Sequence, residues 1–148
     1  MPLLRGIVSV GAGFLLLPLL MRLALMAVVV ASPDVFGPAD PAGTPTDGSA
    51  AVTPTAAFMA LNLGLTALMA AVSAVITARL APEPRYLWVL VLAFLVFAGG
   101  MMVGVQHSGG SVPTWYLLAL PLGSGLSIAL GGYAYLAWRD HRARDLIT

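Results

Sequence analysis

Charged residues are scarce in this sequence. Only 9% of its 148 residues are charged, whereas a soluble domain has about a quarter of its residues charged to cover its surface. The basic residues are seven arginines with no lysine, 59% of the chain is apolar, and the mean hydropathy is +0.95. This composition predicts a chain that lies in a lipid bilayer.

Cysteine is absent, which excludes disulfides, thiol catalysis, iron–sulfur clusters and cysteine-based zinc sites. The apolar segments contain no Asp or Glu, which disfavours carriers that move protons through a buried carboxylate, including the small multidrug transporters. His107 and His141 lie outside these segments, so they form no histidine pair for haem or an intramembrane metal. We expect no enzymatic activity, no cofactor, no metal and no nucleic-acid partner.

Four apolar segments are long enough to cross a bilayer, whose hydrocarbon core of about 30 Å needs roughly 20 helical residues. They cover about residues 6–31, 55–78, 86–106 and 114–138. We therefore predict an all-α integral membrane four-helix bundle that forms a single domain over residues 1–148.

The connections predict how the helices pair. Residues 32–54 contain five prolines, three glycines and three aspartates, which is typical of a solvated loop. The connections at 81–85 and 107–113 are short, so the helices that they join are expected to be antiparallel neighbours. The bundle then consists of two antiparallel helical hairpins.

The distribution of arginine predicts the orientation in the membrane. One side of the predicted topology carries six arginines, namely Arg5, Arg79, Arg85, Arg139, Arg142 and Arg144. The other side carries Asp34, Asp40 and Asp47 and no basic residue. By the positive-inside rule both termini are cytoplasmic, residues 139–148 are a cytoplasmic tail, and the protein is a multi-pass protein of the bacterial inner membrane.

The first apolar segment could also be a secretory signal peptide, because it follows Arg5 and ends at small residues. Its length of about 26 residues exceeds the 7–15 apolar residues of a signal peptide, and Arg22 interrupts it. We therefore expect a retained membrane span.

Small residues at helical spacing predict close helix contacts, because small side chains let helices approach in lipid. These residues are Gly64, Gly100, Gly104, Ser127 and Gly131. Packing within the bundle is the favoured interpretation, and packing against a partner subunit is the alternative.

The second and fourth segments share a pattern at an offset of 59 residues. Pro54-Thr55 followed by Ala60-Leu61-Asn62-Leu63-Gly64 matches Pro113-Thr114 followed by Ala119-Leu120-Pro121-Leu122-Gly123. A duplicated helical hairpin would produce this pattern.

Three stretches of the chain resemble uncharacterised small four-helix bacterial inner-membrane proteins. They are the segment from Pro54 to Leu63, the segment Thr77-Ala78-Arg79-Leu80-Ala81-Pro82, and the pair Gly131-Gly132. The resemblance covers about residues 54–135. It implies the four-helix architecture and no activity.

Arg22 is the one charged residue inside an apolar segment, where a charge costs roughly 2.5–3.5 kcal/mol at the bilayer centre. By helical rise it lies about 14 Å below Ala31, close to the depth expected for Asn62 and Ser124. These three residues could form one polar layer. Pro18 and Pro121 each free a backbone carbonyl and are expected to bend their helices at this level.

Three roles of Arg22 remain open. It could snorkel to lipid headgroups, bond Asn62 and free carbonyls between helices, or contact an anionic lipid headgroup, a quinone-like carbonyl or a partner's carboxylate. The leading functional hypothesis is a non-catalytic accessory or assembly subunit of a larger membrane complex, with membrane lipids and other subunits or further copies as partners. The alternative is a small oligomeric transporter or channel for an anion or lipid, lined by the Arg22–Asn62–Ser124 layer.

Overall fold

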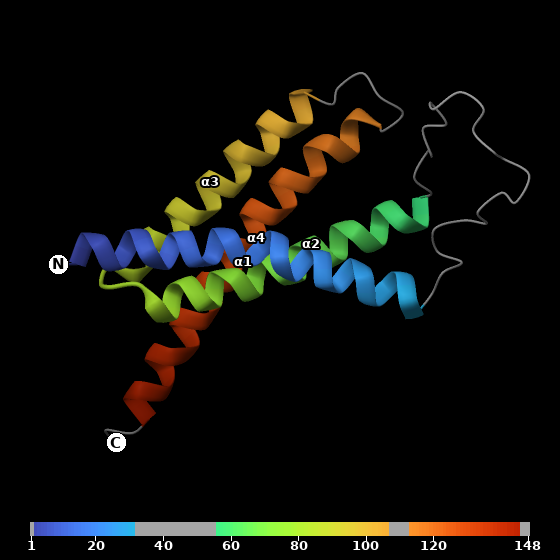
Figure 1. The fold of residues 1–148 in the computed structure, drawn as a ribbon. Helices are drawn as coiled ribbons and strands as arrows, with labels where there is room; N and C mark the ends of the chain where they lie inside the picture. Colours follow the sequence, from blue (N-terminus) through green and yellow to red (C-terminus); the bar gives the residue numbers. More distant parts are fainter. Residues whose placement is uncertain (1, 32–55, 107–112, 146–148) are drawn as a thin grey trace, which may run out of the picture.

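The computed structural model describes residues 2–31, 56–106 and 113–145, and for residues 28–31 the backbone alone. These residues form four helices, α1 (Pro2–Ala31), α2 (Ala56–Leu80), α3 (Arg85–Gln106) and α4 (Thr114–Asp145) (Figure 1). Each helix is long and apolar enough to cross a membrane. Over the described residues the protein is all-helical, and its composition and helix lengths are those of a multi-pass membrane protein. The predicted outer loop at 32–54 lies outside the described residues, as does nearly all of the connection at 107–113.

Two helices are longer than the sequence predicts. α1 begins at Pro2, before the predicted start at Gly6, and α4 continues beyond Trp138 to Asp145. The arginine-rich segment that we expected to be a tail is therefore helical through Asp145. Charged residues end a membrane span but do not end a helix, since arginine is among the good helix formers. In this segment the guanidinium of Arg142 stacks 4.5 Å from the centre of the Trp138 ring.

Proline residues mark the end of α2 and the start of α3. The backbone N–H of Ala81 donates to the Thr77 carbonyl at 2.9 Å and completes the last turn of α2. Pro82 has no N–H and cannot continue the helix. The N–H of Leu87 then donates to the Pro84 carbonyl at 3.2 Å as α3 begins.

α2 and α3 each contact the other three helices, and the contact between α2 and α4 is the most extensive. α3 lies beside α4, and α1 lies against α2 and α3 (Figure 1). In the described part of the chain, α1 makes no contact with α4. This missing contact leaves space between α1 and α4 that the other two helices do not fill.

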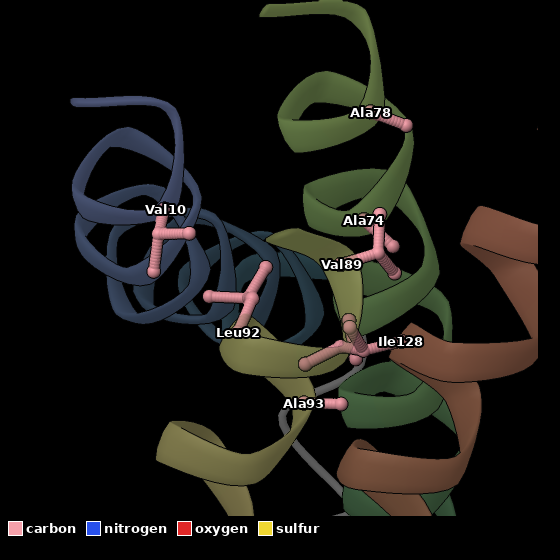
Figure 2. Packing of buried hydrophobic residues seen from close by; sticks show 8 residues of the cluster. Val10, Ala74, Ala78, Val89, Leu92, Ala93 and Ile128 are labelled. Carbon is pink, nitrogen blue, oxygen red and sulfur yellow. The ribbon is translucent and has the colours of Figure 1, made fainter. Parts of the chain in front are cut away.

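The core is built from small side chains. α2 buries Ala70, Ala74 and Ala78 completely, and Val89 and Leu92 of α3 are buried beside them. Figure 2 shows this cluster, whose labelled members are Val10, Ala74, Ala78, Val89, Leu92, Ala93 and Ile128. Small residues let the helix backbones approach closely, which is how helices associate where lipid supplies no hydrophobic driving force.

Candidate functional site: an apolar cleft beside Arg22

An open cleft of about 540 Å³ lies between α1, α3 and α4, with Thr66 of α2 also in its wall. Its volume is within the range of about 300–1,000 Å³ that is usual for small-molecule sites. The residues that line it are mostly apolar: Phe14, Leu17, Pro18, Met21, Thr66, Val96, Gly99, Gly100, Val103, Gly104, Leu117, Leu120, Pro121 and Ser124. The cleft therefore offers an environment for hydrocarbon.

Glycines of α3 shape this cleft. A Cβ placed on Gly100 would lie 2.7 Å from the Cβ of Pro121, and one on Gly104 would lie 3.3 Å from the Leu117 carbonyl oxygen. α4 thus packs directly on the α3 backbone at these two glycines. A Cβ on Gly99 would meet no described atom within 4 Å, so this glycine faces the open part of the cleft.

The two helix-interior prolines both line the cleft. Because Pro121 has no N–H, it leaves the Leu117 carbonyl without its usual helical donor. The structure places the backbone of Gly104 against this carbonyl, and a Cβ at this position would make a tight contact of 3.3 Å with the carbonyl oxygen. On the other side, Pro18 belongs to the wall that α1 contributes.

Most of the polar atoms in the cleft wall already have partners. The Ser124 hydroxyl donates to the Pro121 carbonyl at 3.1 Å, within its own helix. The Thr66 hydroxyl donates to the sulfur of Met21 at 3.6 Å and links α2 to α1. Because these two hydroxyls already donate to protein atoms, the surface that the cleft offers to a ligand is mainly apolar.

Arg22 lies beside the cleft and does not line it. It directly follows Met21 and is one turn beyond Pro18, both of which are in the wall. Its side chain is exposed, and within the described ranges it forms no ion pair or hydrogen bond with another residue. The guanidinium is therefore available at the edge of the cleft.

The structure does not bring Arg22, Asn62 and Ser124 together as one polar layer. The Asn62 amide nitrogen donates to the phenol oxygen of Tyr116, which links α2 to α4. Tyr116 is only 5% exposed, and the Asn62 Oδ1 atom is buried without a partner among the described residues. Asn62 thus serves a contact between helices, Ser124 faces the cleft, and Arg22 lies outside it.

The predicted packing residues divide into two groups. Gly100 and Gly104 contact α4 as described, and a Cβ on Gly131 would lie 3.0 Å from the Cα of Ala71 in α2. Ser127 is half-buried on the same helix as Gly131. Gly64 differs, because it is exposed and a Cβ there would meet nothing within 4 Å in the described structure. The expectation that Gly64 packs within the bundle is therefore not met.

Sequence reasoning missed the contact between α1 and α2. The Ser73 hydroxyl donates to the Gly13 carbonyl at 2.6 Å, and the Thr77 hydroxyl donates to the Ser9 carbonyl at 3.3 Å. On the same face of α1, Gly6 packs against the Trp88 ring of α3, which a Cβ would approach to 2.1 Å. The signal was the row of small residues Gly6, Ser9 and Gly13, which recur every three to four positions and so share one helix face.

Arginine–aromatic pairs cluster near the α2–α3 connection and the end of α4. Arg79 lies 5.4 Å from the centre of the Tyr135 ring, and its Nε donates to the Tyr135 hydroxyl at 3.2 Å. Nearby, Tyr86 and Tyr133 meet edge to face, with ring centres 6.1 Å apart. Such residues are typical of the interface between lipid and water.

The candidate metal ligands do not cluster in the part of the chain that the structure describes. No group of three His, Asp or Glu side chains is placed to hold an ion there. His141 is exposed on the last turns of α4 and lies 3.8 Å from the Asp145 carboxylate, while His107 lies outside the described residues.

Comparison of the chain with protein-family models, with curated protein sequences and with solved structures finds no match.

Proposed function

We propose that this protein is a non-catalytic accessory or assembly subunit of a larger complex in the bacterial inner membrane, with α2 as the helix that docks on its partner. In this proposal the helices form two antiparallel hairpins with both termini in the cytoplasm. The six arginines at the N-terminus, the α2–α3 connection and the end of α4 support this orientation. The partner is another membrane subunit or a further copy of the chain.

The exposed small-residue face of α2 carries this proposal. Ala60 and Gly64 are both exposed and lie four residues apart, so they share one helix face. Other glycines, such as Gly13, Gly100 and Gly131, face neighbouring helices of the same chain at close range. At Gly64, by contrast, a Cβ would meet no described atom within 4 Å, so the space beside this glycine is open. A face of this kind admits a second helix at short distance, as in small-xxx-small helix pairs.

Replacing Gly64 by leucine tests this function. Gentle extraction followed by native mass measurement in lipid should give a particle heavier than the 15.3 kDa chain for the wild type. Gly64→Leu should release the monomer, because the side chain blocks the close approach of a partner helix. Gly11→Leu is the matched control, since a Cβ at Gly11 also meets nothing within 4 Å of the described atoms. This control should keep the heavier particle. A monomeric wild type, or a Gly64→Leu particle of unchanged mass, would contradict the proposal.

A further inference from the structure

The apolar cleft needs an occupant, because its walls are hydrophobic and open in a part of the molecule that lies in the membrane. Its volume of about 540 Å³ is within the range of about 300–1,000 Å³ that is usual for small-molecule sites. A hydrocarbon chain can enter such a space along the glycine-lined surface of α3.

The positive charge of Arg22, next to the cleft, indicates which chemical group the ligand carries there. Arg22 is exposed and has no anionic partner in the described structure. The helix segments that line the cleft contain no Asp or Glu, so Arg22, beside the wall, is a positive charge without a negative one in these segments. A ligand that combines a hydrocarbon chain with an anionic group meets both conditions.

We infer that the cleft holds an acyl chain of an anionic phospholipid whose phosphate is bound by Arg22. The guanidinium offers several N–H donors in a planar fork that matches phosphate oxygens, and such charge-assisted hydrogen bonds are among the strongest in proteins. A lipid with a net negative headgroup is favoured over a zwitterionic one because no described carboxylate in this region would meet an ammonium group. The inference depends on the helices spanning the membrane and is independent of the docking role of Gly64.

The position of Arg22 along α1 fits this arrangement. α1 has 30 residues and is about 45 Å long, which exceeds the hydrocarbon thickness of about 30 Å. A helix of this length tilts, and the flexible arginine side chain extends toward the headgroups. Phe14, Leu17, Pro18 and Met21 then lie deeper than Arg22 on the same helix, where the chain of the bound lipid would run.

Lipid titration of the full chain tests the inference. The protein is freed of lipid in detergent and titrated with phosphatidylglycerol or phosphatidylcholine of the same chain length, and bound lipid is counted by native mass spectrometry. We expect the wild type to retain one phosphatidylglycerol in preference to phosphatidylcholine. Arg22→Gln should weaken phosphatidylglycerol binding about tenfold or more, the size expected for a hydrogen bond to a charged group. It should weaken phosphatidylcholine binding less, because the choline cation already offsets the charge of that lipid's phosphate. Glycerol phosphate, which has the charge and no chain, should not compete.

A second variant tests whether the chain lies in the cleft. Gly99→Leu places a side chain at the cleft surface, at a position where a Cβ meets no described atom within 4 Å. It should weaken the binding of both lipids at least tenfold. Gly11→Leu, at a glycine that does not line the cleft, should bind both lipids as the wild type does.

Three results would overturn the inference: equal affinity of the wild type for the two lipids, unchanged phosphatidylglycerol binding by Arg22→Gln, or unchanged binding by Gly99→Leu. Circular dichroism of each variant verifies its helix content. Should Gly99→Leu lose its helices, the comparison of the wild type with Arg22→Gln decides alone, since the exposed Arg22 side chain has no described partner to lose.

Discussion

Replacing Gly13 by alanine tests how closely α1 approaches α2. A Cβ on Gly13 would lie 2.1 Å from the Thr77 hydroxyl, 3.0 Å from a methyl carbon of Leu92 and 3.2 Å from the Ser73 hydroxyl. All three of these side chains are buried. Either these side chains must rotate away or α1 must move away from α2, and the hydroxyl–carbonyl bonds of Ser73 and Thr77 lengthen or break.

The expected loss of stability follows from three contributions. Overpacking of a close contact costs about 1–3 kcal/mol. Two hydrogen bonds between membrane helices contribute about 0.6 kcal/mol each. Alanine returns up to about 1 kcal/mol because it has a higher helix propensity than glycine. The free energy of unfolding of Gly13→Ala should therefore fall by about 1–4 kcal/mol.

Reversible unfolding in mixed micelles, followed by tryptophan fluorescence, measures this difference. Trp88 of α3 packs against Gly6 of α1 and reports on the attachment of α1 to the rest of the bundle. The control is Gly11→Ala, two residues away, where a Cβ meets no described atom within 4 Å. It should unfold with unchanged free energy or a gain of up to about 1 kcal/mol. If both variants are equally stable, or if Gly13→Ala stays within about 0.5 kcal/mol of the wild type, the close contact between α1 and α2 is refuted.

Two further predictions concern the contact between α2 and α4 and the orientation of the chain. A double-mutant cycle of Asn62→Leu and Tyr116→Phe, measured by the same unfolding assay, should give a coupling energy of about 0.6 kcal/mol and at most about 1.7 kcal/mol; additive effects would show that the bond between the two side chains contributes nothing. Because the chain has no cysteine, single variants Glu83→Cys and Thr114→Cys can be labelled in intact cells with a thiol reagent that does not cross the membrane. Thr114→Cys should react in intact cells, whereas Glu83→Cys should react only after the cells are opened. The reverse pattern would invert the proposed topology.

The helices were predictable because their signals are strong and local. An uninterrupted apolar segment of about 20 residues satisfies its own backbone in lipid as a helix, whatever it packs against. The helix ends were less predictable at α4, where the predicted span ends at Trp138 but the helix continues to Asp145. Hydropathy reports where the membrane ends, whereas helix termination depends on caps and backbone hydrogen bonds.

The candidate site was only partly predictable. Helical rise gives depth, so Arg22, Asn62 and Ser124 could be assigned similar levels, but depth does not give the direction of a side chain around the bundle. That direction depends on which helices meet, and here α1 and α4 do not. Pro18, Pro121, Gly100 and Gly104 were recognised one by one from the sequence as irregularities or packing residues. That these four line one space, together with Gly99, follows from the packing of three helices.

The length of α4 has a mechanical consequence. The helix is continuous from Thr114 to Asp145, and its 32 residues measure about 48 Å, well beyond a hydrocarbon core of about 30 Å. When a continuous helix is longer than the layer it crosses, a change in its tilt also moves the part that extends beyond the layer. Arg142, stacked on Trp138, lies on the part that extends past the aromatic boundary. A change in tilt of the apolar part of α4, for example at Pro121 in the cleft wall, therefore displaces the charged residues at the end of the helix.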